Sequence, residues 1–220
     1  MKVLPISLIM HDGPISRAYL GLLFENGFLF KKIYLLIYKR DLITKKEIFP
    51  NTPIFFKKKI SKYIQKNQLN FWIYKLRILY PRIVREIEDK LSDSLLINKK
   101  IFSHLYYTKN LSKYSSHINE IFVDKISDIK SFLSQTSDET FLFSSGGILT
   151  KKCFENRNKI IHIHPGFLPF IKGADGLLWS LMLKNTAGVS AFYMNAKLDA
   201  GDIILRENIK LPKLSKNILD

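Results

Sequence analysis

The chain has 220 residues, of which 46% are hydrophobic and 25% charged, a balance typical of a globular protein with one sizeable core. We predict no membrane-spanning helix, because no apolar run reaches the roughly 20 residues that such a helix needs. The N-terminal segment has no secretory cleavage site, and the single cysteine excludes an internal disulfide. We therefore expect a cytoplasmic protein in which Cys153 is a small, half-buried core residue.

The net charge is +16, with 35 Lys and Arg residues against 19 Asp and Glu. A charge of this size suits a nucleic acid, an anionic membrane surface or a phosphorylated substrate. However, Lys, Ile, Asn and Phe are abundant along the whole chain, which is what an AT-rich genome produces without selection for binding. The charge alone therefore does not decide between these partners. We favour the compositional explanation over a dedicated nucleic-acid role.

The first forty residues predict a strand, a helix and a second strand. Pro5–Met10 forms a buried strand, Ser16 is a candidate N-cap, and Gly27 stands where a helix end favours glycine. Ile33–Tyr38 is an apolar run of strand length. Such a βαβ unit predicts a parallel sheet with right-handed crossovers.

A helical, basic insertion is predicted at about residues 44–100. Ile60, Tyr63 and Ile64 follow helical spacing, and Pro81 should break the helix. Such a segment suits contact with a membrane or an anionic ligand, whereas a solvated helix face explains the same pattern. The lysines concerned are Lys57, Lys58, Lys59, Lys62 and Lys66.

The second half returns to alternating strands and helices. Strands are predicted at Glu120–Val123, Thr140–Ser144, Ile160–His164, Val189–Asn195 and Ile203–Ile209, and helices at Ser127–Gln135 and Ala174–Lys184. The fold class is therefore α/β, with a doubly wound, mostly parallel sheet, a helical insertion and residues 1–220 as a single domain. Ligands of such sheets bind beyond the carboxyl ends of the strands.

Two of the five histidines lie together at the carboxyl end of a predicted strand. His162 and His164 are two residues apart, so their side chains should point to the same face. As core residues, each imidazole would need its own hydrogen-bond partner. We therefore favour a functional pair over a pair of satisfied core histidines.

These histidines open a pattern that resembles the formyltransferases using N10-formyltetrahydrofolate, which include glycinamide ribonucleotide, methionyl-tRNA and sugar N-formyltransferases. Three ordered blocks carry the resemblance, with the family pattern N-x-H-P-S-x-L-P for the first. They are His162–Pro169 (HIHPGFLP, followed by Lys172–Ala174), Gly188–Ser190 (GVS) and Leu198–Ile204 (LDAGDII). The likeness covers roughly Phe141 to Ile209, and the insertion has no counterpart in it.

The resemblance implies roles for particular residues. His164 and Asp199 take the places of the catalytic histidine and aspartate. His162 replaces the family's asparagine, and Gly166 replaces its serine. The implied co-substrate is N10-formyltetrahydrofolate, held by the loop of Ser145, Gly146, Gly147, Ile148 and Leu149.

Formyl transfer is acyl transfer, in which negative charge grows on the carbonyl oxygen and needs preorganised donors. His162 can donate in place of the asparagine amide. Asp199 should stabilise the protonated form of His164, orient its ring and relay the proton of the attacking amine. We expect His11 and Asp12, after the first strand, to bind substrate. Asp175 is either a helix cap or a ligand for the substrate amine.

Two other classes of function remain open. His162, His164 and Asp199 could bind a metal in a metal-dependent hydrolase. A non-catalytic module could bind RNA or an anionic sugar. Among amine acceptors we favour an amino-sugar nucleotide, by analogy, over a purine precursor or methionyl-tRNA. The chain ends soon after its last predicted strand, which fits either a complete domain or a fragment.

Overall fold

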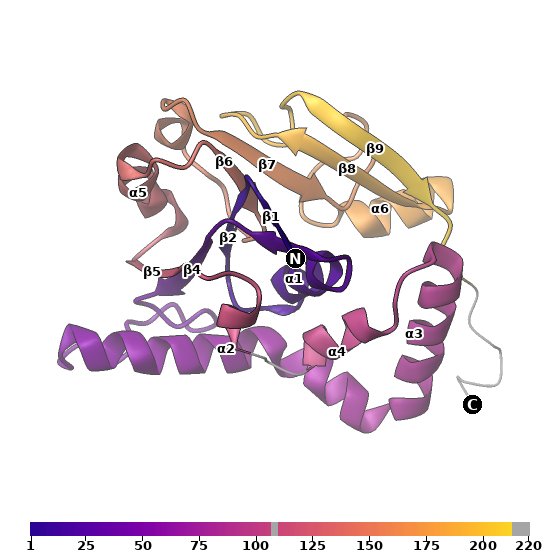
Figure 1. The fold of residues 1–220 in the computed structure, drawn as a ribbon, viewed down its shortest axis with the longest axis horizontal. Helices are drawn as coiled ribbons and strands as arrows, with labels where there is room; N and C mark the ends of the chain where they lie inside the picture. The colour runs from indigo at the N-terminus through magenta and orange to yellow at the C-terminus, as the bar shows by residue number, and fades with distance from the viewer. Residues whose placement is uncertain (107–109, 213–220) are drawn as a thin grey trace.

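The computed structural model describes residues 1–106 and 110–212. Its centre is a seven-stranded sheet (Figure 1). The strand order is β5 (Ile118–Val123), β4 (Ile33–Tyr38), β2 (Ser7–Met10), β6 (Thr140–Phe143), β7 (Lys159–His164), β8 (Ala187–Tyr193) and β9 (Ile203–Ile209). Neighbours from β5 to β7 are parallel, whereas β8 and β9 are added antiparallel.

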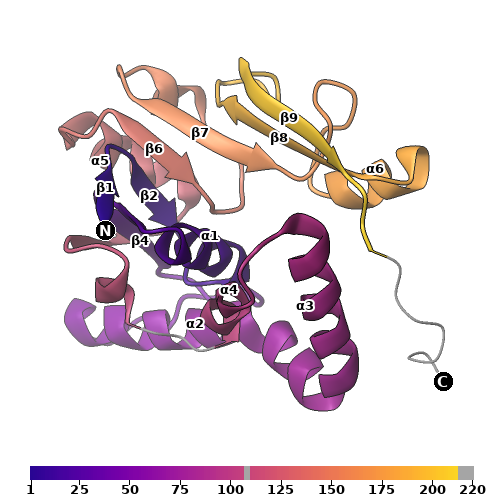
Figure 2. The ribbon, with the colours of Figure 1, turned by 45° about the vertical axis from the view of Figure 1, so that its right-hand side comes forward.

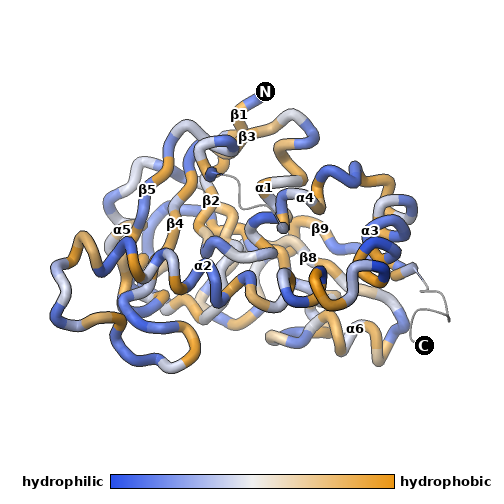
Figure 3. Tube along the Cα trace, turned by 90° about the horizontal axis from the view of Figure 1, so that it is seen from below, coloured by the Kyte–Doolittle hydropathy of each residue, from blue (hydrophilic) through white to orange (hydrophobic). Residues whose placement is uncertain are grey.

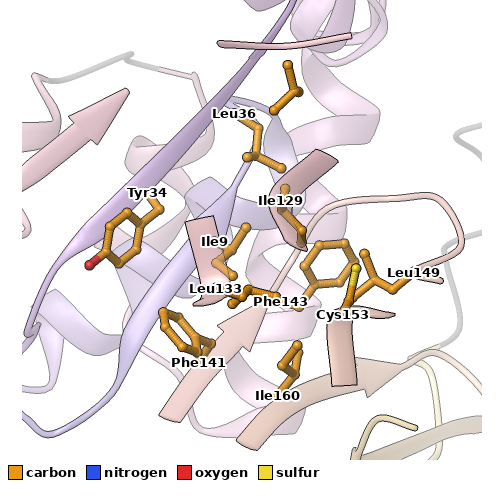
Figure 4. Packing of buried hydrophobic residues seen from close by; sticks show 11 residues of the cluster. Ile9, Tyr34, Leu36, Ile129, Leu133, Phe141, Phe143, Leu149, Cys153 and Ile160 are labelled. Carbon is orange, nitrogen blue, oxygen red and sulfur yellow. The ribbon is translucent and has the colours of Figure 1, made fainter. Parts of the chain in front are cut away.

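The central strands β2 and β4 are apolar and buried on both faces of the sheet. Leu8 and Met10 of β2 belong to one buried cluster, which contains Leu20 of α1 (Pro14–Glu25). Ile9 points the other way, into a second cluster with Ile129 of α5 (Ile129–Gln135), as alternation along a strand requires (Figure 4). Figure 3 shows β2 and β4 as hydrophobic stretches. The predicted doubly wound α/β fold is confirmed.

Two details of the first βαβ unit differ from the prediction. Helix α1 begins after Gly13 with Pro14 in its first turn, so Ser16 lies inside the helix and not at its cap. Proline is well suited to that position because its missing N–H has no partner in a first turn. A small parallel sheet of β1 (Lys2–Leu4) and β3 (Phe28–Phe30) was also missed, because both strands are only three residues long.

The insertion is helical, but its predicted boundaries were wrong. It consists of α2 (Ile54–Leu79), α3 (Pro81–Leu95) and α4 (Lys100–Tyr106), and Pro81 separates the first two as predicted. Residues 44–53 form turns, and Glu47 in this segment pairs with Arg40 in an isolated β-bridge. Figure 2 shows α2 along one side of the sheet, with α3 extending from its end.

Two buried amides of α2 bind backbone groups at the carboxyl ends of two strands. Gln65 accepts from Tyr38 N at 2.9 Å and donates to Tyr38 O at 2.6 Å. Asn70 donates to Asp12 O at 2.7 Å. The polar groups that β4 and β2 leave at their ends are thus satisfied by the inserted helix.

The basic residues of α2 are only partly solvated. Lys57 is buried and pairs with Glu47. Lys58 and Lys62 both pair with Glu120 of β5, so they join the helix to the sheet. In the described parts of the chain, no helix is long and apolar enough to cross a membrane.

The remaining short elements complete the second half. The 3-10 helices are η1 (Leu111–Lys113), η2 (Ile126–Asp128) and η3 (Lys151–Phe154), and α6 spans Gly176–Lys184. Cys153, expected to be half-buried, lies fully buried in the cluster with Ile129.

Candidate active site

A cavity of about 500 Å³ lies beyond the carboxyl ends of β6 and β7. The chain order changes direction at this part of the sheet, because β4 and β5 extend from one side of β2 and β6 to β9 from the other. Open α/β sheets bind ligands at such a switch point. Its walls are the loop of residues 144–149, the segment His162–Pro165, the loop of residues 194–199 and two residues of α1.

His164 and Asp199 meet at this cavity, as predicted from their places in the sequence. The side chains are 3% and 11% exposed, and His164 Nδ1 lies 3.8 Å from Asp199 Oδ2. This is an ion-pair distance and too long for a hydrogen bond. His164 Nε2 donates to the carbonyl of Ile171 at 3.0 Å. Both nitrogens of the ring therefore have a defined neighbour.

The ring of His164 occupies a space that two glycines leave open. A Cβ on Gly166 would lie 2.5 Å from His164 Nε2, and one on Gly176 would lie 2.9 Å from the same atom. Atoms cannot approach that closely, so a larger residue at either position would displace the ring. Gly166, where the resembling family has serine, thus fits the observed orientation of His164.

Asp199 is held by the loop between β8 and β9. Its Oδ2 accepts from Gly173 N at 2.8 Å, and its φ is +45°, a conformation that aspartate tolerates better than most residues. Close approach of the loop to β8 requires Gly201, since a Cβ there would lie 1.5 Å from Tyr193 O. The turn therefore fixes the carboxylate beside His164.

His162 also lines the cavity, as its two-residue spacing from His164 predicts. Its Nδ1 lies 2.9 Å from the carbonyl of Phe143 on the neighbouring strand β6. Burial lowers the pKa of His162, opposed by the bond to Phe143 and the charge of Asp199. The ring is therefore neutral near pH 7.

The predicted folate loop follows β6 and forms one wall of the cavity. Ser145, Gly146, Gly147, Ile148 and Leu149 all line it. Ser145 is buried and its Oγ has no hydrogen-bond partner among the described residues, whereas Gly146 has open space around it. The wall therefore offers backbone groups more than side-chain polar atoms.

The three predicted substrate-binding residues do not line this cavity. Asp12 is buried and makes two bonds to Arg17, at 2.6 and 2.9 Å. His11 packs on Tyr38 with ring centroids 4.9 Å apart, and burial lowers its pKa to about 4. Asp175 is exposed at the start of α6 and makes no side-chain cap bond. Their assignment as substrate ligands stays a prediction.

Sequence reasoning missed the contribution of α1. Ile15 and Tyr19, four residues apart on one face of the helix, both line the cavity. Burial raises the pKa of Tyr19 to about 12, so its phenol keeps its proton. The i, i+4 pair directly after the first predicted strand was the available signal.

A metal site needs several ligand side chains grouped together. Within residues 1–106 and 110–212, no three His, Cys, Asp or Glu side chains are grouped to hold a metal ion. His162 Nδ1 and His164 Nε2 both face backbone carbonyls.

The second half of the chain is similar to known formyltransferases. Residues 129–216 match the formyl transferase family. A methionyl-tRNA formyltransferase of Syntrophus aciditrophicus is 42% identical over 53 residues, 24% of this chain and 17% of that protein. One from Prochlorococcus marinus is 34% identical over 90 residues, 40% of this chain and 27% of that protein. The chain thus spans about a quarter or less of the length of these relatives.

Solved structures with a similar chain path are more distant in sequence. A sugar N-formyltransferase from a Shewanella species is 15% identical, with a TM-score of 0.45 over 97% of this chain and 58% of that one. A phosphoribosylglycinamide formyltransferase from Anaplasma phagocytophilum is 15% identical, with a TM-score of 0.48 over 98% of this chain and 74% of that one.

Proposed function

We propose that the chain transfers a formyl group from N10-formyltetrahydrofolate to the primary amine of a small molecule, because residues 129–216 match the formyl transferase family. The observation that supports this most strongly is the cavity in which His164 and Asp199 lie 3.8 Å apart. In this proposal, residues 1–220 act as a single catalytic domain.

The cavity fits a folate-type donor in size and chemistry. A volume of about 500 Å³ is within the range of small-molecule sites. The loop of Ser145–Leu149 offers backbone N–H and C=O groups, and Gly146 leaves room for close approach of a flat ring. When bound, the donor would supply the formyl group and leave as tetrahydrofolate.

His164 and Asp199 would stabilise the charge that grows during transfer. The proton on His164 Nε2 is held by Ile171 O, and a second proton on Nδ1 would complete an ion pair with Asp199. The resulting imidazolium places positive charge in the wall of a cavity partly sheltered from water, where negative charge develops on the formyl oxygen. Asp199 also fixes the orientation of the ring.

The acceptor we propose is an amino-sugar nucleotide, with the reaction in the cytoplasm. Support comes from the insertion of α2 to α4, which is expected of a specialised enzyme, and from the analogy with sugar N-formyltransferases. The curated relatives carry the name methionyl-tRNA formyltransferase, so methionyl-tRNA is the second candidate. The net charge of +16 would suit the phosphates of a tRNA, but the composition of the whole chain accounts for it equally well.

The test is incubation of the full chain with N10-formyltetrahydrofolate and a panel of amines. The panel contains amino-sugar nucleotides, glycinamide ribonucleotide and methionyl-tRNA. We expect tetrahydrofolate release with one acceptor, together with a product heavier by one formyl group in mass spectrometry. The matched control is the double variant His164→Ala, Asp199→Asn. Release no faster than in this control, with every acceptor, would refute the proposed activity.

A further inference from the structure

The two ring nitrogens of His162 have different surroundings. Nδ1 lies 2.9 Å from Phe143 O. Nε2 makes no hydrogen bond to the described residues and, unlike Nε2 of His11, is not sealed from solvent. Because His162 lines the cavity, the free nitrogen is available to a molecule that binds there.

The bond to Phe143 decides which nitrogen carries the proton. A carbonyl oxygen only accepts, so Nδ1 must be the donor. A neutral imidazole has one N–H, and its other nitrogen then carries a lone pair. Nε2 of neutral His162 is therefore a hydrogen-bond acceptor and a base, whereas an asparagine amide at this position could donate two hydrogens.

Neighbouring strands keep the ring in this orientation. The ring of Phe143 on β6 lies 6.2 Å from that of His162, and Phe192 on β8 contacts it edge-on at 5.9 Å. A flip of the ring would break the bond to Phe143 O. The ionisable groups that act on it are Asp199, which favours its charged form, and His164, which opposes it. Burial is the largest influence and keeps the ring neutral.

We infer that His162 Nε2 accepts the proton that the attacking amine loses, rather than donating a hydrogen bond to the formyl oxygen. The inference rests on the proposed formyl transfer. In that reaction a bond forms between the amine nitrogen and the formyl carbon, and the bond from that carbon to N10 breaks. The electron pair of the broken bond stays on N10. The proton that the amine nitrogen gives up to His162 then passes to N10, so the ring ends the cycle neutral. Atoms and charge balance without another reactant.

His164 and His162 then have different roles in the site. The bonds of His164 allow it to carry two protons beside Asp199, so its role is electrostatic. His162 carries one proton, directed at Phe143 O, and leaves a lone pair for the amine. A donor role for His162 would need a proton on Nε2, which the neutral ring lacks.

The test combines a pH profile with direct observation of the tautomer. In the parent, kcat/KM should fall on the acid side as one group with a pKa below 6.5 takes up a proton. His162→Asn should lower kcat about 10²-fold or more, the usual scale of lost general-base catalysis, and remove that acid limb. KM for the folate donor should stay within about twofold, since the amide can still face Phe143 O. His117→Asn, at an exposed position, is the matched control and should behave like the parent.

Nitrogen-15 NMR of the parent gives a readout that does not need turnover. We expect His162 to be neutral at pH 7, with its proton on Nδ1. A proton on Nε2, or a His162→Asn variant with the parent's rate and pH profile, would overturn the acceptor role alone. Absence of formyl transfer by the parent would overturn the proposed function, and the acceptor role with it. If His162→Asn does not fold, the tautomer and the parent's acid limb still decide the matter.

Discussion

Two strand ends of this sheet carry a histidine and an acid, but only one pair lies at the cavity. His11 and Asp12 follow β2, whereas His164 ends β7 and meets Asp199. Both histidines lie at carboxyl ends of parallel strands, where ligand sites of such folds are found. The residue types are therefore the same for the two pairs, and so is the position of each histidine, whereas Asp199 comes from the loop between β8 and β9.

What differs is the use of the polar atoms. Both carboxylate oxygens of Asp12 are bonded to Arg17, and its backbone carbonyl accepts from Asn70 of α2. Asp199 makes one backbone bond, to Gly173 N, and lies beside the ring of His164 in the cavity wall. A polar side chain at a strand end is thus available for chemistry only where neighbouring elements have not already satisfied its hydrogen bonds.

The largest expected effect comes from breaking the β7 pair. His164→Ala and Asp199→Asn should each lower kcat/KM for formyl transfer about 10²- to 10³-fold, because both act on the same developing charge. The double variant should be hardly slower than either single variant, since residues that act as a unit give non-additive losses. Steady-state kinetics measure this, with circular dichroism to confirm folding. Multiplied losses in the double variant would show that the two residues act independently.

Breaking the β2 pair should affect stability instead of chemistry. Asp12→Asn removes the counter-charge of Arg17, whose side chain is 1% exposed, and should lower the free energy of unfolding by about 3 to 5 kcal/mol. Urea denaturation measures the loss, and kcat of the folded protein should change little. Arg17→Met added to Asp12→Asn should recover part of it, because no buried charge is left unpaired. A large fall in kcat at full stability would instead place Asp12 in the active site.

A smaller effect, confined to acid, is expected from His11. Its pKa is about 4 in the folded chain, against 6.5 as the ordinary value, because burial opposes its charge. Below pH 6.5 the unfolded chain takes up a proton that the folded chain refuses until about pH 4. Stability should therefore fall over this interval by up to about 3 kcal/mol. The variant His11→Gln lacks this titration, so its free energy of unfolding, measured by urea denaturation, should fall less between pH 6.5 and 4 than that of the parent. Parallel plots of the free energy of unfolding against pH would contradict the prediction.

The smallest expected effect is at the donor wall. Ser145→Ala should change the affinity for a folate analogue by less than about twofold, because its Oγ makes no hydrogen bond to the described residues and backbone contacts survive the change. Gly147→Leu is the contrasting variant. Its φ of +102° and a Cβ 3.2 Å from Ile126 leave no place for a side chain, so binding should be lost. Titration calorimetry compares the two, and equal binding by both variants would remove this loop from the donor site.

How far the sequence predicts this structure depends on the range of the interactions. Ile33–Tyr38 and Ile203–Ile209 were placed to the residue, since apolar strand runs are local signals. The meeting of His164 and Asp199 followed from the motif that contains both. The capture of Asp12 by Arg17 was not predicted, because nothing in the sequence tells a buried arginine from an exposed one. The docking of Asn70 was missed because its partner lies 58 positions away.

The bonds from Gln65 and Asn70 bear on any attempt to shorten this protein. Removal of the helical segment would reduce the chain to a smaller scaffold, but the N–H and C=O of Tyr38 and the C=O of Asp12 would lose their partners. Each such group costs about 1 to 3 kcal/mol if it stays buried and unsatisfied. A trimmed enzyme would therefore need new hydrogen-bond partners for the ends of β2 and β4. Without them, water would enter beside these strands and loosen the half of the sheet away from the cavity.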